Sequence, residues 1–438
     1  MAEQTEKAAA PLFGELGVSG LKVFSGYVDE EFLQELKGPR GMKTYRQMAE
    51  NDSTISAVLT AIDLLIRAAD WSVTAANDSP EAEEAALFAQ SLMDDMNQPF
   101  EDFVSEALSM LPYGWSYFET VMKRRVGPTE RDPRRRSKYT DGKIGIRKLA
   151  IRSQDTLGHW QMQDDGGIAG MWQMPPTGSQ EVFIPIEKAL LFRTSMLKNN
   201  PEGKSILRQA YRSWYILKTV QNAESIGIER ELAGLPVARI PADYMKSDAD
   251  SASKAFYATI KQIVRDLKFN AQGGVVVPSD YYPDENGNPT SQRMVEIELL
   301  STGGRRAIDT NATVLRYQRD IARAALADFI MLGTDGKGSY ALSQDKTDLF
   351  LRACETYLNR IASVMNRILL PRVWDYNGMN RDLMPEFAPG NVAPTDLGEL
   401  GTFIESLSRA GAPLFPDPKL EGYLRDTAGL PEADAEAM

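Results

Sequence analysis

Histidine and cysteine are almost missing from this 438-residue sequence, which contains one of each. The single cysteine, Cys354, excludes a disulfide within the chain, and its position in a helical pattern predicts a small buried side chain. A single histidine, His159, excludes histidine-rich metal sites and argues against a histidine-dependent catalytic triad. Enzyme classes that depend on these two residue types are therefore disfavoured.

Long apolar runs are missing as well. No stretch of about 18 consecutive apolar residues occurs, so we expect no membrane span. The N-terminal segment MAEQTEKAAAPLFG lacks the basic start and apolar core of a signal peptide. We therefore expect a protein that is made in the cytoplasm and has no membrane partner.

A phosphate-binding loop is also absent, although the glycine-rich stretch LGTDGKGSY, residues 332–340, resembles one superficially. A P-loop has about four residues between its first glycine and its Gly-Lys pair. Here Gly333 precedes Gly336 and Lys337 by only two residues, and no apolar strand leads into the stretch. The sequence therefore predicts no nucleotide cofactor at this place.

The turn with Asp284, Asn286 and Asn288 has the alternating oxygen ligands of a calcium loop. It has Pro289 where such a loop needs glycine, and Val295 where it needs the closing glutamate. We interpret this segment as a plain β-turn. The sequence as a whole thus predicts no catalytic, cofactor-binding or metal site, and a protein that is not an enzyme.

The net charge of −12 is unevenly distributed along the chain. Residues 1–122 contain 7 basic against 21 acidic residues, residues 123–374 contain 38 against 28, and residues 375–438 contain 4 against 12. A sequence-specific DNA-binding protein normally has a strongly basic domain, because neutralised phosphates supply much of its affinity. This distribution instead indicates weak overall contact with nucleic acid and positive charge in selected places.

One such place is the stretch KRRVGPTERDPRRRSK, residues 123–138, with eight basic and two acidic residues. It is open to three interpretations: a DNA contact, a solvated loop that joins two strands, or a patch that meets an acidic neighbour. The latter two are favoured, because runs of charge most often lie on solvated surfaces.

Residues 305–370 form a predicted pair of helices around the glycine-rich stretch. On the first helix, Arg316, Arg319 and Arg323 recur on a different face from the apolar positions. The second helix carries an apolar stripe, and Pro371 is expected to end it. The glycines Gly333, Gly336 and Gly338 predict a mobile loop that projects Lys337.

The remaining pattern predicts an α+β protein. Ser53 or Asp52 is a candidate cap for a helix with an apolar face, and residues 114–193 read as strands separated by turns. Another predicted helix, which precedes this pair in the sequence, begins near Ser205 and ends by Gly234. About 70 residues of mixed character separate this helix from the one that carries the three arginines.

The order of these segments resembles the portal proteins of tailed bacteriophages, in particular the Mu-like branch. The resemblance covers most of the chain. It is carried by the helix-strand segment 45–73, the strand-turn-helix segment 190–241 with its NPEGKSILR turn, the helix pair 305–370 and the C-terminal segment 403–432.

The resemblance implies the portal fold, with a mixed α/β wing, a long helical stem, a small inserted clip module and a short helical crown. On this sequence the implied parts are an N-terminal arm, 1–40; the wing, 41–204; a first stem helix, 205–234; the clip module, 235–304; a second stem helix, 305–331; a tunnel loop, 332–342; a return helix and wing segment, 343–392; and the crown with a C-terminal tail, 393–438.

The implied function is that of a ring, expected to be a homododecamer, at one vertex of the virion capsid. Double-stranded DNA would pass through its channel non-specifically during packaging and ejection. The implied partners are the terminase large subunit, which would hydrolyse the ATP, head-completion and tail adaptor proteins, and capsid or scaffold proteins. The protein would be made in the host cytoplasm and would end up in the virion.

Such a channel needs weak, repeated contacts, because a wall that bound phosphates tightly would stall the DNA. Lys337 is the residue that we expect nearest to DNA, although a solvated loop lysine is an equal alternative. Arg316, Arg319 and Arg323 are expected to pair with acids on a neighbouring stem helix rather than face the channel. The candidate acids are Glu224, Glu229 and Glu231.

Two other classes of function remain open at this level. A different ring-forming head-tail connector or tail-tube protein is one, although such proteins are typically shorter and lack the helix-module-helix order. A metal-dependent nucleic-acid-processing enzyme is the other, and cleavage of DNA by the purified protein would favour it.

Overall fold

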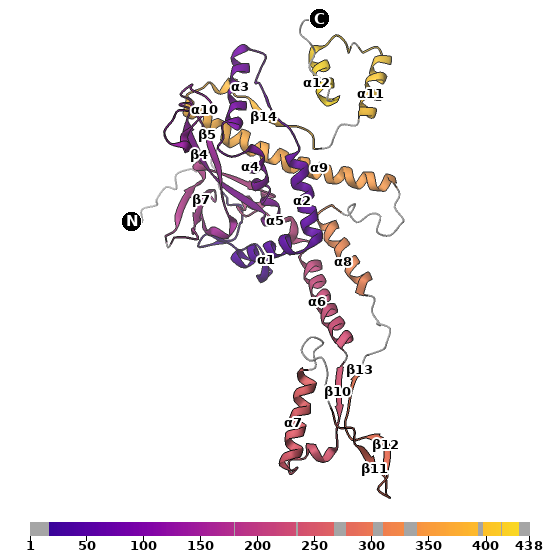
Figure 1. The fold of residues 1–438 in the computed structure, drawn as a ribbon. Coiled ribbons are helices and arrows are strands. Elements are labelled where there is room, and N and C mark those ends of the chain that lie inside the picture. The colour runs from indigo at the N-terminus through magenta and orange to yellow at the C-terminus, as the bar shows by residue number, and fades with distance from the viewer. Residues whose placement is uncertain are drawn as a thin grey trace, which may run out of the picture. The chain divides into compact units, whose positions relative to one another are not determined.

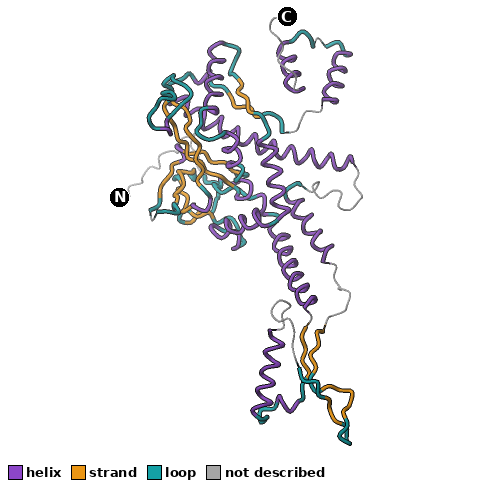
Figure 2. The backbone as a smooth tube through the Cα atoms, in the orientation of Figure 1, coloured by secondary structure: helices purple, strands orange, loops and turns teal. Residues whose placement is uncertain are grey.

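The computed structural model describes residues 17–178, 180–233, 235–266, 277–300, 310–327, 340–392, 397–412 and 414–428. Contacts within the chain divide it into two compact units, residues 1–211 together with 319–438, and residues 212–318. Helices and strands are mixed in both (Figures 1 and 2), so the predicted α+β class is confirmed.

The larger unit has helices that begin at capped turns. Asp52 rather than Ser53 is the cap of the second helix, because its side chain accepts hydrogen bonds from the amides of Thr54 and Ile55, each at 3.0 Å. Such a cap satisfies first-turn amides that have no partner within the helix. The α-helices that lie wholly in this unit are α1 (Gly38–Asn51), α2 (Ser53–Arg67), α3 (Pro80–Asp94), α4 (Phe100–Ala107), α5 (Met110–Tyr113), α9 (Tyr340–Val364), α10 (Leu370–Asn377), α11 (Leu397–Arg409) and α12 (Pro418–Ala428).

All strand pairs of this unit are antiparallel. The order is β5-β4-β9 in one three-stranded sheet and β6-β7-β8 in another. The strand β3 pairs with β14 from the far end of the chain, and Ser72 Oγ donates to the carbonyl of Ala388, 316 residues away. The bounds are β1 (Val23–Phe24), β2 (Tyr27–Val28), β3 (Trp71–Thr74), β4 (Trp115–Arg124), β5 (Ile144–Arg152), β6 (Leu157–Met162), β7 (Ile168–Gln173), β8 (Val182–Pro185), β9 (Ala189–Arg193) and β14 (Glu386–Pro389).

The core of the larger unit forms where aromatic rings from α4, β4 and β9 meet. Phe103 lies with its ring centroid 5.2 Å from that of Phe118 and 5.9 Å from that of Phe192, and all three side chains are fully buried. Tilted and edge-on pairs of this kind add about 0.5–1.5 kcal/mol each beyond the burial of their area. Cys354 on α9 lies buried in the same core, as predicted.

The helix after the glycine-rich stretch does not stop at Pro371, so that prediction was wrong. A π-helical turn, Met365–Leu369, follows α9, and the chain then continues as α10 with proline in its first turn. Proline, which has no amide to donate, is accommodated because the π-helical turn just before it already interrupts the regular helical hydrogen bonds. The true end lies at Gly378, which adopts a left-handed conformation with φ 62°.

The smaller unit contains most of α6 (Tyr211–Ala233) and the first part of α8 (Thr310–Ala324), with a mixed module between them in sequence. Asp284 closes the β11-β12 hairpin, since its Oδ1 accepts from the amides of Asn286 and Asn288 at 2.8 Å each. This is the predicted β-turn. The module comprises β10 (Leu235–Arg239), which pairs with β13 (Glu296–Leu300), together with α7 (Ser251–Asp266), β11 (Tyr281–Pro283) and β12 (Pro289–Arg293).

Among the helices that the structure describes, none combines the length and apolar character that a bilayer crossing requires.

A cavity of about 420 Å³ in the larger unit is lined by both acids and bases. Glu30 pairs with Lys198 at 2.9 Å, and Glu31 pairs with Arg208. Glu202 differs from these acids, because its carboxyl group accepts a hydrogen bond from a neutral donor, the indole Nε1 of Trp160, at 3.2 Å. Burial of its carboxyl group raises the pKa of Glu202 to about 7.

This shift predicts a pH-dependent stability. The folded protein holds the Glu202 proton more tightly than the unfolded chain, so its stability is full below about pH 4.5, the ordinary pKa of the group, and falls as pH rises from there to about 7. The Glu202→Gln variant has no carboxyl group at this position, so the free-energy cost of ionising a buried carboxyl group disappears. The variant should match the parent near pH 4 and exceed it by up to about 3 kcal/mol near pH 8.

Thermal melting of parent and variant at several pH values measures this difference. The control is Glu83→Gln on the exposed face of α3, which removes a carboxyl group that does not line this cavity. A Glu202→Gln difference that is constant with pH would contradict the assignment.

Candidate nucleic-acid interface

The predicted tunnel loop lies largely outside the described residues. Gly333, Gly336, Lys337 and Gly338 all belong to the undescribed stretch, and their roles stay predictions. The last residues assigned to the loop, 340–342, are helical, because α9 begins at Tyr340.

The three arginines of the predicted basic face lie on α8. Arg316 is exposed, and its guanidinium carbon lies 4.8 Å from the ring centroid of Tyr317. Arg323 is also exposed and pairs with Asp320, one turn earlier, at 3.6 Å, whereas Arg319 is half-buried. Exposed pairs of this kind contribute about 0–1 kcal/mol, so they do not fix the orientation of this face.

Glu224, one of the acids expected to pair with these arginines, lies on α6. Its Oε1 accepts a hydrogen bond from Thr310 Oγ1 at 2.6 Å. Pairing of the arginines with acids of another copy stays a prediction.

The basic stretch 123–138 connects β4 to β5, as expected of a loop that joins two strands. Not all of its charge is on the surface. The side chains of Lys123 and Arg125 are each only 2% exposed, whereas Arg134 and Arg135 are more than 70% exposed. The stretch therefore has a buried charged part and an exposed charged part.

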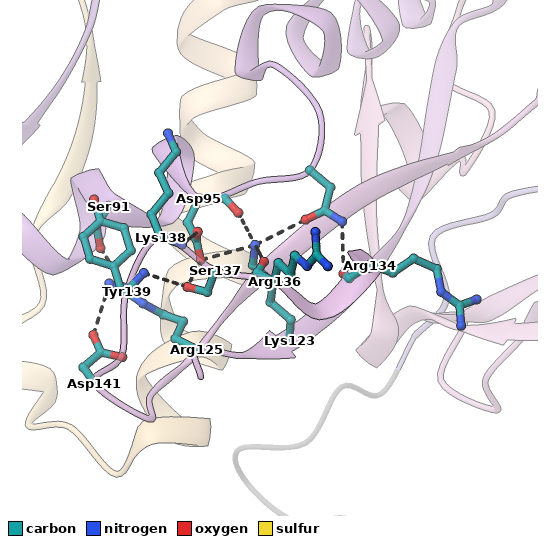
Figure 3. A network of polar contacts seen from close by, with 11 residues as sticks. Ser91, Asp95, Lys123, Arg125, Arg134, Arg136, Ser137, Lys138, Tyr139 and Asp141 are labelled. Carbon is teal, nitrogen blue, oxygen red and sulfur yellow. Dashed lines mark hydrogen bonds and ion pairs between the residues drawn. The ribbon is translucent and has the colours of Figure 1, made fainter. Parts of the chain in front are cut away.

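Lys123 is the centre of the buried part (Figure 3). Its ammonium lies 3.3 Å from the carboxylate of Asp95 and donates to three oxygens: the carbonyls of Asp95 and Arg136, and Oδ1 of Asn97. Asp95 directly follows the C-terminus of α3, where the helix dipole disfavours a carboxylate. The ammonium neutralises the charge of the Asp95 carboxylate and donates a hydrogen bond to the Asp95 carbonyl.

The same carboxylate fixes the end of the loop. Asp95 Oδ2 accepts from Ser137 Oγ at 2.7 Å, and its Oδ1 accepts from the amide of Lys138 at 2.8 Å. Asn97 adds a further tie, because its Nδ2 donates to the carbonyl of Arg134 at 3.0 Å. The loop backbone is thus held from its inner side.

Arg125 supports the return of the loop toward β5. It donates to Ser91 Oγ at 2.8 Å and pairs with Asp141 at 3.1 Å. Its guanidinium also lies 3.9 Å from the ring centroid of Tyr139 and 5.2 Å from that of Phe88. A stacked guanidinium of this kind is held in place by both charge and packing.

The exposed part of the loop carries cations around a short 3-10 turn, Pro133–Arg135. Asp132 caps this turn and accepts from the amide and the guanidinium of Arg134. The Arg134 hydrogen bond is the main reason that the pKa of Asp132 is lowered. In Figure 3 the side chains of Arg134 and Lys138 extend away from the network.

Metal chemistry has no visible counterpart in this part of the structure. Within the described ranges, no group of three or more His, Cys, Asp or Glu side chains is placed to hold an ion.

Comparison with known families decides the class of protein. The family model described as the portal protein of Mu bacteriophage matches residues 42–430. The chain belongs to this portal protein family. The resemblance inferred from the order of its segments is therefore confirmed. A search of curated protein sequences finds no match to the chain.

Solved structures align with most of this chain at low sequence identity, and the one with a TM-score of 0.50 shows the same fold. A chain from the virion of a native gene transfer agent particle has a TM-score of 0.50 at 14% identity, over 90% of this chain and 95% of that chain. The neck of a native gene transfer agent particle with C12 symmetry scores 0.48 at 15%, over 90% and 95%. An HK97 family phage portal protein from Corynebacterium diphtheriae scores 0.39 at 12%, over 82% and 96%.

The division of the basic stretch was missed at the level of sequence. Alternation in β4 carried a usable signal, because Lys123 and Arg125 are two residues apart and fall on one face, with Arg124 on the other. The alternation does not show that Asp95, 28 residues earlier in the chain, lies against that face.

Removal of the buried ammonium should be costly. Lys123→Met leaves the Asp95 carboxylate buried without its cation, and we expect the free energy of unfolding to fall by about 3–5 kcal/mol. The double variant Lys123→Met with Asp95→Asn should recover part of this loss, because no charge is then stranded.

Urea or thermal unfolding measures both effects. Arg124→Met is the matched control, since this neighbouring cation is exposed, and its stability should change by less than about 0.5 kcal/mol. Equal effects of the Lys123 and Arg124 changes would show that the buried pair does not hold the loop.

Proposed function

We propose that this portal protein assembles into a closed ring of twelve copies at one capsid vertex, with a channel for packaging and ejection of double-stranded DNA. The observation that carries the proposal is the family match over residues 42–430. A ring of identical subunits also gives each copy the same two neighbours, as closed cyclic symmetry requires.

The parts of the chain are assigned to roles within that ring. The smaller unit supplies the stem and the clip: α6 and α8 are the stem helices, and the module of β10 to β13 with α7 is the clip. Most of the larger unit is the wing, and α11 and α12 form the crown. The clip would offer a docking surface for the terminase large subunit and for head-completion or tail adaptor proteins, and capsid or scaffold proteins would contact the wing.

The proposed mechanism is mechanical and electrostatic. A terminase would supply ATP hydrolysis, since the glycine-rich stretch lacks the spacing of a P-loop. The acidic balance of the chain limits tight binding of DNA, and a few cations near the channel would centre the duplex. No reaction step is assigned to this protein.

Ring formation is the first test. Size-exclusion chromatography with light scattering should give a mass many times the 48.6 kDa of one chain, and negative-stain images should show rings with a central hole. A monomer at every salt and protein concentration would refute the proposal.

The two cationic sites of the stem and loop should differ in phenotype. Lys337→Ala should leave the thermal stability of the ring unchanged and alter the length or retention of packaged DNA, because one exposed lysine adds little to folding. Arg319→Ala should lower ring stability, and more so at low salt, where ion pairs between copies are least screened. Melting curves at low and high salt and a packaging assay test both variants. If Lys337→Ala destabilises the ring while Arg319→Ala changes only packaging, the two assigned roles are reversed.

A further inference from the structure

We propose that the β4-β5 loop, residues 126–140, is a second DNA-binding surface that holds the phosphate backbone of a duplex through its exposed cations. This inference deepens the proposed function, because it concerns the same DNA. It concerns a different segment from the glycine-rich stretch, and its physical basis is independent of that stretch.

The loop is built as a rigid support. The carbonyls of Arg134 and Arg136 are directed inward, to Asn97 Nδ2 and the Lys123 ammonium at 3.0 and 2.8 Å. The amide of Ser137 donates to the carbonyl of Gly127 at 3.2 Å, which closes the loop on itself. Because the backbone faces the protein interior, the side chains of these arginines are left on the outer side.

The outer side is strongly cationic. The loop has two acids, Glu130 and Asp132, and its bases are Arg131, Arg134, Arg135, Arg136 and Lys138. All five bases are exposed. Asp132 offsets part of this charge, with its carboxylate 3.0 Å from Arg134 and 3.9 Å from Arg135.

The 3-10 turn Pro133–Arg135 carries two of these cations, Arg134 and Arg135. Successive residues of such a turn point about 120° apart, since it has about three residues per turn. The guanidinium groups of Arg134 and Arg135 nevertheless converge on Asp132, whose carboxylate lies 3.0 Å from one and 3.9 Å from the other, so they form one local concentration of positive charge. Guanidinium groups also bind phosphate in a bidentate manner.

The composition of the loop favours nucleic acid over an acidic protein. A protein-protein interface normally needs apolar or aromatic residues that become buried at its centre. Among the large apolar side chains of this loop, only Val126 is exposed, at 42%. Interfaces with nucleic acid are more polar and much more positively charged, which matches this surface.

Binding through this loop should be weak and sensitive to salt. The chain carries a net charge of −12, so the rest of the molecule repels DNA. A contact limited to a few phosphates lets a duplex exchange quickly and loses affinity steeply as salt rises.

The test uses rings of the full-length protein and a fluorescent duplex of about 30 base pairs, with anisotropy measured between 50 and 200 mM salt. The loop variant combines Arg131→Gln, Arg135→Gln and Lys138→Gln, and it leaves Lys123, Asn97 and Asp95 intact. We expect at least a tenfold loss of affinity at 50 mM salt, and a salt slope smaller by up to about 3, because each lost phosphate contact removes about 0.9.

The matched control removes three exposed cations elsewhere in the larger unit, Lys43→Gln, Lys188→Gln and Arg367→Gln. It should lose clearly less affinity than the loop variant. Asp132→Asn should act in the opposite direction and tighten binding, because it releases Arg134 and Arg135 from their shared carboxylate.

Equal losses in the loop variant and the control, or no binding by the parent at 50 mM salt, would overturn the inference. Tighter binding of polyglutamate than of a duplex of equal charge would assign the surface to an acidic protein instead. Light scattering of the same samples separates this result from the proposed function. If the parent forms no ring, the proposed ring assembly is contradicted. The anisotropy of the loop variants still tests whether the β4-β5 loop binds DNA.

Discussion

The ion pair between Lys123 and Asp95 determines how the charged face of the larger unit is arranged. Both side chains are almost fully buried, and burial of two charges carries a desolvation cost that an apolar pair of the same size would avoid. The structure nevertheless retains the charges. The charges fix a geometry, because an ammonium that has four oxygen neighbours and donates to the carbonyl of Arg136 holds the loop backbone in one arrangement. An apolar contact, which has no preferred direction, would not fix the position of the loop backbone.

This arrangement separates two uses of positive charge in one short stretch. Lys123 and Arg125 are neutralised inside the protein and give the loop its shape. Outside, the cations of residues 131–138 face solvent, on a chain that is acidic overall. A uniformly basic surface would hold DNA, whereas a uniformly acidic one would repel it.

Local chemistry explains what the sequence predicted well. Asp52 satisfies nearby amides, Asp284 closes its own turn, and Cys354 lies on the apolar face of a regular helix. Each of these depends on residues only a few positions away. The order of segments likewise sufficed to predict the α+β class and the family.

What failed or was missed depends on distant partners. Pro371 is accommodated because a π-helical turn precedes it, and Asn366 in that turn pairs with both backbone groups of Phe387 on β14. The burial of Lys123 requires Asp95 from another element. Neither partner follows from spacing along the chain, because tertiary contacts decide which helix turn or strand face is enclosed. The roles of Lys337 and of Arg316, Arg319 and Arg323 stay predictions.

The pairing of β3 with β14 has a consequence for synthesis. Ser72 and Ala388 are 316 residues apart, so β3 leaves the ribosome long before its partner strand exists. At about 5–20 residues per second, its edge stays unpaired for about 15–60 s on every nascent chain. An open strand edge can pair with another chain, and several chains made on one messenger are close together. Production of the folded protein thus depends on keeping the edges of early strands apart until their late partners are made.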